Sequence, residues 1–138
     1  MSMDTTVEQV EGAVPITILA LNGELDASNF RELIDTVKRL YDEGARKLII
    51  DLAGLRFMAS SGLVALHSIV QVMHGQDPLD PEGGWQALHS LGGDAQTEVR
   101  LAAPQPAVER VLQRTGLDRM FVVHADRHTA IDAASAAA

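Results

Sequence analysis

The sequence predicts a single α/β domain with a mixed, largely parallel sheet of about four to five strands, packed with about four helices. Short β-branched or apolar segments alternate along the chain with segments whose apolar residues recur at helical spacing. A turn signal separates the first two predicted strands, which indicates an opening hairpin and therefore a mixed sheet. A length of 138 residues fits one domain of ordinary size.

The beginning of the chain predicts a hairpin followed by an amphipathic helix. Residues 5–10 and 14–21 are rich in β-branched and apolar residues and flank the turn signal at Glu11-Gly12. Residues 22–26 predict a loop. A helix follows, with Asp26 or Ser28 as its cap, Gly44 as its stop and one apolar face formed by Phe30, Leu33, Ile34, Val37, Leu40 and Tyr41.

The middle of the chain predicts a buried strand and a mostly apolar helix. Residues 48–52 form a continuous apolar run broken only by Asp51, which is typical of a strand covered on both faces. Residues 53–57 predict a connection. In the helix over 63–73, His67 and Gln71 lie four apart as a narrow polar stripe, so the remaining surface should be buried or face a partner.

Residues 75–96 interrupt this alternation and predict an insertion. They contain Pro78, Pro81 and two Gly-Gly pairs. The single tryptophan, Trp85, either packs the insertion back onto the domain or forms a contact with a partner or another copy of the chain.

The end of the chain returns to strands and helices. We expect strands at 98–103 and 120–123, a helix at 106–115 stopped by Gly116, and a last helix capped by Asp126. The predicted domain therefore covers 4–134, with the insertion at 75–96, and residues 135–138 form an Ala-rich tail.

Composition excludes several classes of function. The formal net charge of −8 disfavours nucleic acid and anionic membrane surfaces as partners and favours a basic protein. The chain has no cysteine, which excludes disulfides and thiol chemistry. It shows neither a signal peptide nor an apolar run near the roughly 20 residues of a membrane helix, so we expect a cytoplasmic protein without membrane insertion.

Two serines at the predicted start of the apolar helix are the strongest candidates for a functional site. In one interpretation Ser60 is a helix cap, whose hydroxyl accepts a backbone hydrogen bond worth about 1 kcal/mol. In the other, the hydroxyl is also open to a kinase. A phosphate would add about −1.5 to −2 charges, which a helix N-terminus tolerates. Such a change would act on binding and not on folding.

Four segments together resemble the STAS domain family. They are Gly23-Glu24-Leu25-Asp26, residues 48–63 ending in Phe57-Met58-Ala59-Ser60-Ser61-Gly62-Leu63, residues 100–104, and residues 111–117. Within that family the chain is most similar to the bacterial anti-sigma factor antagonists. The resemblance covers most of 5–134 and excludes the insertion at 75–96.

The resemblance implies a regulatory binding protein that is not an enzyme and needs no cofactor. It implies that the unmodified protein binds an anti-sigma factor that is a serine kinase with a histidine-kinase-like ATPase fold. Phosphorylation would reverse this binding, and a metal-dependent serine phosphatase would restore it. Ser60 corresponds to the phosphoacceptor, with Ser61 as second choice. The resemblance also implies that Ser61, Gly62 and Asp26 lie at the interface. We predict that the partner-binding residues are Asp26, Ala59, Ser60, Ser61, Gly62, Leu63 and His67.

One departure from the family pattern keeps an alternative open. The family usually has an acid before the acceptor serine, where this chain has Ala59. The chain could therefore be a constitutive scaffold or accessory subunit, in a stress-signalling complex or a lipid-transport system, without regulation by phosphate. The oligomeric state is left undetermined by the sequence.

Enzymatic and metal-binding alternatives are weaker. A serine hydrolase would need Gly-x-Ser-x-Gly, and Met58 stands where the first glycine would be. His124, Asp126 and His128 offer metal-ligating side chains, but they are expected to straddle a strand end and a helix start. The dinucleotide and P-loop fingerprints are absent.

Overall fold

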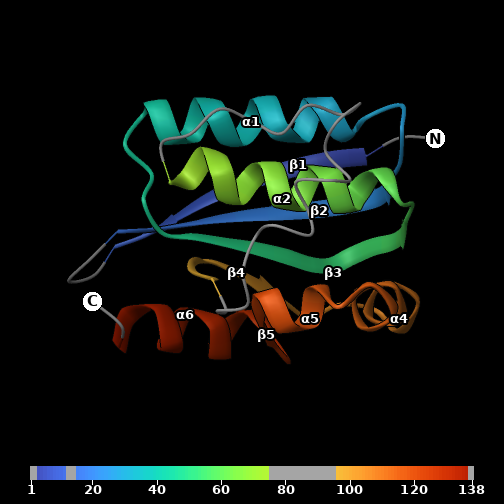
Figure 1. The fold of residues 1–138 in the computed structure, drawn as a ribbon. Coiled ribbons are helices and arrows are strands. Elements are labelled where there is room, and N and C mark those ends of the chain that lie inside the picture. Colours follow the sequence, from blue (N-terminus) through green and yellow to red (C-terminus); the bar gives the residue numbers. More distant parts are fainter. Residues whose placement is uncertain (1–2, 12–14, 75–95, 137–138) are drawn as a thin grey trace.

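Five strands form one mixed sheet (Figure 1). The structure is a computed structural model and describes residues 3–11, 15–74 and 96–136. In the sheet, β1 pairs antiparallel with β2, and β2 to β5 pair in parallel. The α/β class and the opening hairpin are thus confirmed. The strands, which neighbour each other in chain order, are β1 (Met3–Val10), β2 (Ile16–Leu25), β3 (Leu48–Met58), β4 (Gln96–Ala102) and β5 (Phe121–His124).

Helices cover both faces of the sheet. In Figure 1, α1 and α2 lie on one face and α6 lies on the other. The single-turn helix α5 was not predicted. It arises because Gly116 ends α4 with a φ of +80°, after which the chain turns back into helical geometry. The described helices are α1 (Phe30–Asp42), α2 (Ser61–Met73), α4 (Pro106–Thr115), α5 (Leu117–Met120) and α6 (Arg127–Ala136).

Strands β2 and β3 extend further than the sequence predicts. Residues 22–25 and 53–57 were expected in loops, and that expectation is wrong. They pair in parallel from Asn22↔Gly54 to Leu25↔Met58, with one register shift before Asn22 and another between Gly23 and Glu24. A Cβ at position 54 would lie 1.9 Å from Asn22 Oδ1 and 3.1 Å from the carbonyl oxygen of Leu21, so a larger residue there would displace the Asn22 side chain. Glycine and polar residues have a low strand propensity, so the sequence did not indicate strands here. Hydrogen bonds to the neighbouring strand hold these residues in strand conformation.

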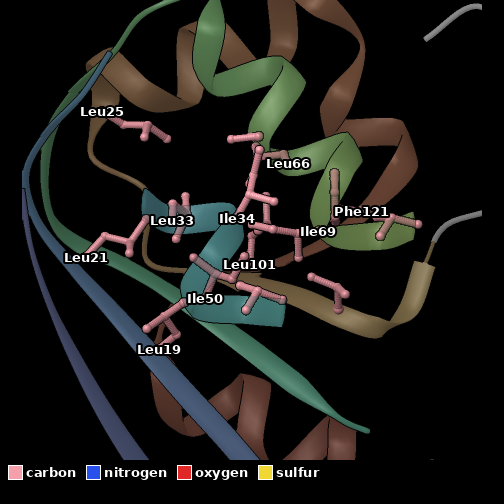
Figure 2. Packing of buried hydrophobic residues seen from close by; sticks show 14 of the residues in the cluster. Leu19, Leu21, Leu25, Leu33, Ile34, Ile50, Leu66, Ile69, Leu101 and Phe121 are labelled. Carbon is pink, nitrogen blue, oxygen red and sulfur yellow. The ribbon is translucent and has the colours of Figure 1, made fainter. Parts of the chain in front are cut away.

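The main core lies between the sheet and helices α1, α2 and α4. Figure 2 shows residues from β2, β3 and β4 meeting residues of α1 and α2. The inward face predicted for α1 is confirmed by five buried residues, and Tyr41 is half-buried against the same cluster. In α2, eleven of thirteen residues are buried. The residues labelled in Figure 2 are Leu19, Leu21, Leu25, Leu33, Ile34, Ile50, Leu66, Ile69, Leu101 and Phe121.

The opposite face of the sheet carries a much smaller apolar cluster beneath α6. It consists of Ile16, Ile18, Ile49, Ala102, Ala130 and Ala134. Polar contacts supplement it at both ends of the helix. Arg127 donates from Nε and Nη2 to Oδ2 of buried Asp51, at 2.9 Å each. Lys47 Nζ donates to the carbonyl of Ala134 at 2.9 Å. Charge and small-residue packing together hold α6 in place.

The predicted cap of the last helix is confirmed. Asp126 Oδ1 accepts a hydrogen bond from the backbone N–H of Thr129 at 2.7 Å. This bond and a second one to the Thr129 side chain lower the pKa of Asp126 below its usual value. No helix in the described part of the chain is both long and apolar enough to cross a membrane.

Candidate functional site

The carboxyl ends of β2 and β3 lie side by side and bring the two family-like motifs together. The N–H of Ala59 donates to the carbonyl of Leu25 at 2.8 Å. Asp26 therefore follows one strand end and Ser60 follows its neighbour. In parallel sheets, binding residues gather at this edge because every strand presents its following loop there.

Ser60 immediately precedes α2 and is exposed. Its backbone has φ −59° and ψ −28°, which is already helical, and its hydroxyl makes no capping hydrogen bond. The cap interpretation of this side chain is therefore wrong. Backbone groups close the first turn instead, with N–H of Gly62 donating to the carbonyl of Ala59 at 2.9 Å. The Ser60 hydroxyl is left open to an approaching molecule.

Ser61 differs from Ser60 in its surroundings. The residue is half-buried and its Oγ is fully enclosed. Within the described part of the chain this oxygen has no hydrogen-bond partner. An enclosed hydroxyl cannot reach the active site of a kinase without local opening of the helix. The two adjacent serines are thus chemically alike but sterically distinct.

Gly62 and Leu63 fix the start of α2 against the sheet. A Cβ on Gly62 would lie 2.4 Å from Cγ of Met58 and 3.1 Å from Cδ2 of Leu25. Glycine at position 62 therefore allows the helix to approach the ends of both strands. Leu63 is 7% exposed and belongs to the main core, so its contribution is to packing.

Asp26 organises the loop that faces Ser60 from the neighbouring strand. Its Oδ1 accepts hydrogen bonds from the Oγ and the backbone N–H of Ser28, the latter at 2.9 Å. These bonds lower the pKa of the Asp26 carboxyl below its usual value, so the group stays ionised at neutral pH. Buried Asn29 completes the turn by accepting from the Asp26 N–H at 3.0 Å.

The predicted caps of α1 are wrong in detail. Neither Asp26 nor Ser28 caps the helix through its side chain. Asn29 stands at the cap position, and its Nδ2 donates to the carbonyl of Glu24 at 2.8 Å, so it secures the loop and not the helix. The first helical N–H, that of Phe30, donates to the carbonyl of Asp26 at 3.0 Å.

His67 does not lie on the surface, which contradicts the predicted polar stripe. It is 3% exposed, and its Nδ1 is enclosed without a hydrogen-bond partner among the described residues. Burial lowers the pKa of His67 to about 4. The sequence pattern failed here because an isolated polar residue on an apolar helix has no periodicity of its own. In this conformation His67 cannot touch a partner.

A family model described as the STAS domain matches residues 5–76. The chain belongs to the STAS domain family. The match includes both strand ends and the start of α2, so it covers the site just described. It stops where the predicted insertion begins.

Solved structures of other proteins share this fold over 88% to 96% of the chain. An anti-sigma factor antagonist from Mycobacterium paratuberculosis is 24% identical, with a TM-score of 0.68, over 96% of this chain and 94% of that one. The unphosphorylated form of the anti-sigma factor antagonist SpoIIAA is also 24% identical, with a TM-score of 0.59, over 94% of each chain. The SulP transporter STAS domain from Vibrio cholerae is 20% identical, with a TM-score of 0.55, over 88% of this chain and 78% of that one.

Phe57 is a residue of this STAS site that the sequence reasoning missed. It is 45% exposed and precedes Ser60 by three positions. Beside it, Arg56 and Glu24 form an ion pair of 3.6 Å across β2 and β3. Placing 53–57 in a connection hid the signal. In the strand, Arg56 and Phe57 are both exposed between buried Leu55 and Met58.

The other residues predicted as contact residues or metal ligands lie away from this site or outside the described residues. Trp85 and residues 75–95 fall outside, and residue 96 is the first of β4. His124 lies 3.3 Å from Arg100, whereas His128 lies 3.3 Å from Asp132. The part of the chain that the structure describes holds no group of three metal-ligating side chains.

Proposed function

We propose that this STAS domain is an anti-sigma factor antagonist, a cytoplasmic binding protein without catalytic activity. It binds a serine-kinase anti-sigma factor of histidine-kinase-like ATPase fold through the surface around Ser60. The observation that carries this proposal is that Ser60, at the carboxyl edge of the sheet, is exposed and that its hydroxyl makes no capping hydrogen bond. The family membership and the likeness to anti-sigma factor antagonists support it.

Phosphorylation of Ser60 is proposed as the off switch. The first-turn N–H groups of α2 favour a nearby anion, so a phosphate leaves the fold intact. Asp26, which follows the neighbouring strand, is kept ionised by its hydrogen bonds to Ser28. A phosphate on Ser60 would add a second negative charge to the same edge of the sheet. A partner that binds unmodified Ser60 would have to desolvate a dianion. Removal of the phosphate by a serine phosphatase restores binding. The structure of SpoIIAA has also been solved in its phosphorylated form, and it matches this chain with a TM-score of 0.54.

Phe57 supplies an apolar contact for the same partner. An exposed aromatic side chain buries a large area when it is covered, and such residues often dominate interface energies. Its position beside the Arg56–Glu24 pair gives the surface an apolar centre with charges at its rim. The charge balance of −8 favours a partner whose contact surface is basic.

The test uses paired serine variants. The chain is incubated with a candidate anti-sigma kinase and MgATP, and intact mass is measured. Wild type and Ser61→Ala should gain one phosphate, whereas Ser60→Ala should gain none, because only the Ser60 hydroxyl is exposed. A kinase that modifies a positive-control antagonist and leaves this chain unmodified would contradict the switch. Phosphate on Ser60→Ala would contradict the choice of acceptor.

A second function is favoured by Ala59, which replaces the acid usual in the family. In this alternative the chain is a constitutive STAS scaffold or accessory subunit, and its likeness to a SulP transporter STAS domain fits that role. Ser60→Glu discriminates between the two functions. Binding to a captured partner should fall at least tenfold for a switched antagonist. It should be unchanged for a constitutive subunit.

A further inference from the structure

One buried amide side chain holds the loop that follows β2. Asn29 stands at the start of α1 and is 5% exposed. Its Oδ1 accepts a hydrogen bond from the N–H of Asp26 at 3.0 Å, and its Nδ2 donates to the carbonyl of Glu24 at 2.8 Å. The oxygen and the nitrogen of the amide are therefore both used within one short segment, and the side chain makes no capping hydrogen bond to α1.

A role in starting the helix accounts for only part of this arrangement. A side chain that accepts from the N–H three residues earlier is common where a chain enters a helix. The bond to Glu24 is different, because it returns to the strand that precedes the loop. The backbone also closes the turn by itself, since the N–H groups of Asn29 and Phe30 both donate to the Asp26 carbonyl, at 3.2 and 3.0 Å. The side chain of Asn29 therefore fixes the loop relative to β2.

At one end, the amide holds a strand residue that lies opposite the exposed aromatic side chain. Glu24 is the register partner of Phe57 in β3, and its carboxylate forms the 3.6 Å ion pair with Arg56. The register shift between Gly23 and Glu24 makes this part of the ladder irregular. A side-chain bond to the Glu24 carbonyl can therefore contribute more to order here than within a regular pair of strands.

At the other end, the amide holds the acid on the loop that faces Ser60. Asp26 accepts from Ser28 only while residues 26–28 keep one turn conformation, and the bond to Asn29 Oδ1 fixes the first residue of that turn. Without this bond the Asp26 N–H loses its partner and the turn can open. The carboxylate would then occupy several positions instead of one, next to the serine that follows the neighbouring strand.

We propose that Asn29 is a positioning residue for partner recognition. By bonding both Glu24 and Asp26, its side chain keeps the loop after β2 in the conformation that a partner at Ser60 binds. This inference rests on the proposed function. A partner binds less tightly when only a fraction of the molecules has the competent conformation, and its apparent dissociation constant rises by the inverse of that fraction. Loss of the amide should therefore weaken recognition and leave the chemistry at Ser60 unchanged.

Asn29→Ser tests this inference in the full chain. Serine starts a helix as readily as asparagine, but its shorter side chain cannot bond Asp26 and Glu24 together. With the kinase that phosphorylates wild type and MgATP, the KM for Asn29→Ser should rise about fivefold, as expected if about one fifth of the molecules keep the ordered loop. The kcat should stay within about twofold of wild type, and Ser60 should remain the acceptor.

Val37→Ala is the control for a general loss of stability. Val37 is fully buried in α1 and belongs to the main core, so this variant is destabilised away from the loop. It should keep the wild-type KM. Melting curves establish that both variants are folded at the assay temperature.

Titration of the Asp26 carboxyl by NMR gives a second measurement, which needs no kinase. Hydrogen bonds from Ser28 lower the pKa of Asp26, so a loosened turn should raise this pKa toward its usual value in Asn29→Ser and leave it unchanged in Val37→Ala. An unchanged pKa in Asn29→Ser would overturn the inference, and so would a raised pKa together with the wild-type KM. A raised pKa in a chain that no kinase modifies would support the hold of Asn29 on the loop and contradict the proposed function alone.

Discussion

The two faces of the sheet are covered in different ways. The face beneath α1 and α2 is packed by a large apolar cluster that draws on every strand from β2 to β5. The face beneath α6 has a short cluster of three isoleucines and three alanines, and its helix is fixed at both ends by Arg127 and Lys47. One face is thus stabilised mainly by close packing, and the other by a thin apolar layer with directional polar bonds. The difference predicts different responses to mutation and to pH.

Neighbouring isoleucines on β3 give the most direct test of this difference. Ile49 and Ile50 are both fully buried but point to opposite faces. We expect Ile50→Ala to lower the free energy of unfolding by about 2–5 kcal/mol, because the densely packed face cannot close the cavity. Ile49→Ala should cost about 1–2 kcal/mol less, since α6 can move toward the sheet. Urea denaturation measures both values, and an equal or larger loss for Ile49→Ala would contradict the comparison.

The face beneath α1 and α2 should also disfavour a buried positive charge on His67. Burial lowers the pKa of His67 to about 4, whereas the unfolded chain binds this proton near 6.5. As pH falls from about 6.5 toward 4, His67 binds a proton in the unfolded state but not in the folded state, so the free energy of unfolding decreases over this range. The loss should reach about 2 kcal/mol at pH 5 relative to pH 7.

The variant His67→Leu isolates this contribution. Its stability should depend less on pH between 7 and 5 than that of wild type, whereas His128→Asn, which changes an exposed histidine, should keep the wild-type dependence. Denaturation curves at both pH values supply the measurement. Parallel pH dependences of wild type and His67→Leu would mean that His67 is charged in the folded protein.

The α6 face should also lose stability when its ionic contact is removed. Arg127→Met removes the Nε and Nη2 donors from the Asp51 carboxylate, which among the described residues keeps the bond from the Ala53 N–H. We expect a loss of about 1–3 kcal/mol, because a buried acceptor is left incompletely bonded. Glu8→Gln breaks only the more exposed pair with Arg127 and should cost less than about 0.5 kcal/mol.

Hydrogen exchange localises the effect of Arg127→Met. Amides of α6 should exchange faster than in wild type, while amides of α1 keep their protection apart from the global change in stability. Equal acceleration in both helices would show that the two faces unfold as one unit. That result would remove the distinction between them.

Much of the fold follows from local sequence patterns. The apolar spacing from Phe30 to Leu40 defined α1, and the run at 48–52 defined the central strand, because each pattern reflects burial that the structure confirms. The ends of β2 and β3 could not be predicted in this way. Their residues are strands only because Asn22 and Gly54 meet across the sheet, a contact between segments about thirty residues apart.

The candidate site was predictable in part. The position of Ser60 before an apolar helix is visible in the sequence, but its missing cap bond depends on backbone angles that the sequence does not display. The contrast between exposed Ser60 and enclosed Ser61 depends on the packing of α2. The prediction that His67 lies on an exposed stripe failed because helical periodicity describes a single helix. The burial of His67 depends instead on how many other elements surround α2.

The position of α6 in the chain has a consequence for biosynthesis. A ribosome makes all five strands before it makes α6, so Ile16, Ile18 and Ile49 leave the exit tunnel well before the helix that covers them. During that interval the nascent sheet presents an uncovered row of isoleucines, a surface of the kind that chaperones bind. The rate at which the last helix is translated and docks therefore limits how long this surface is exposed to aggregation.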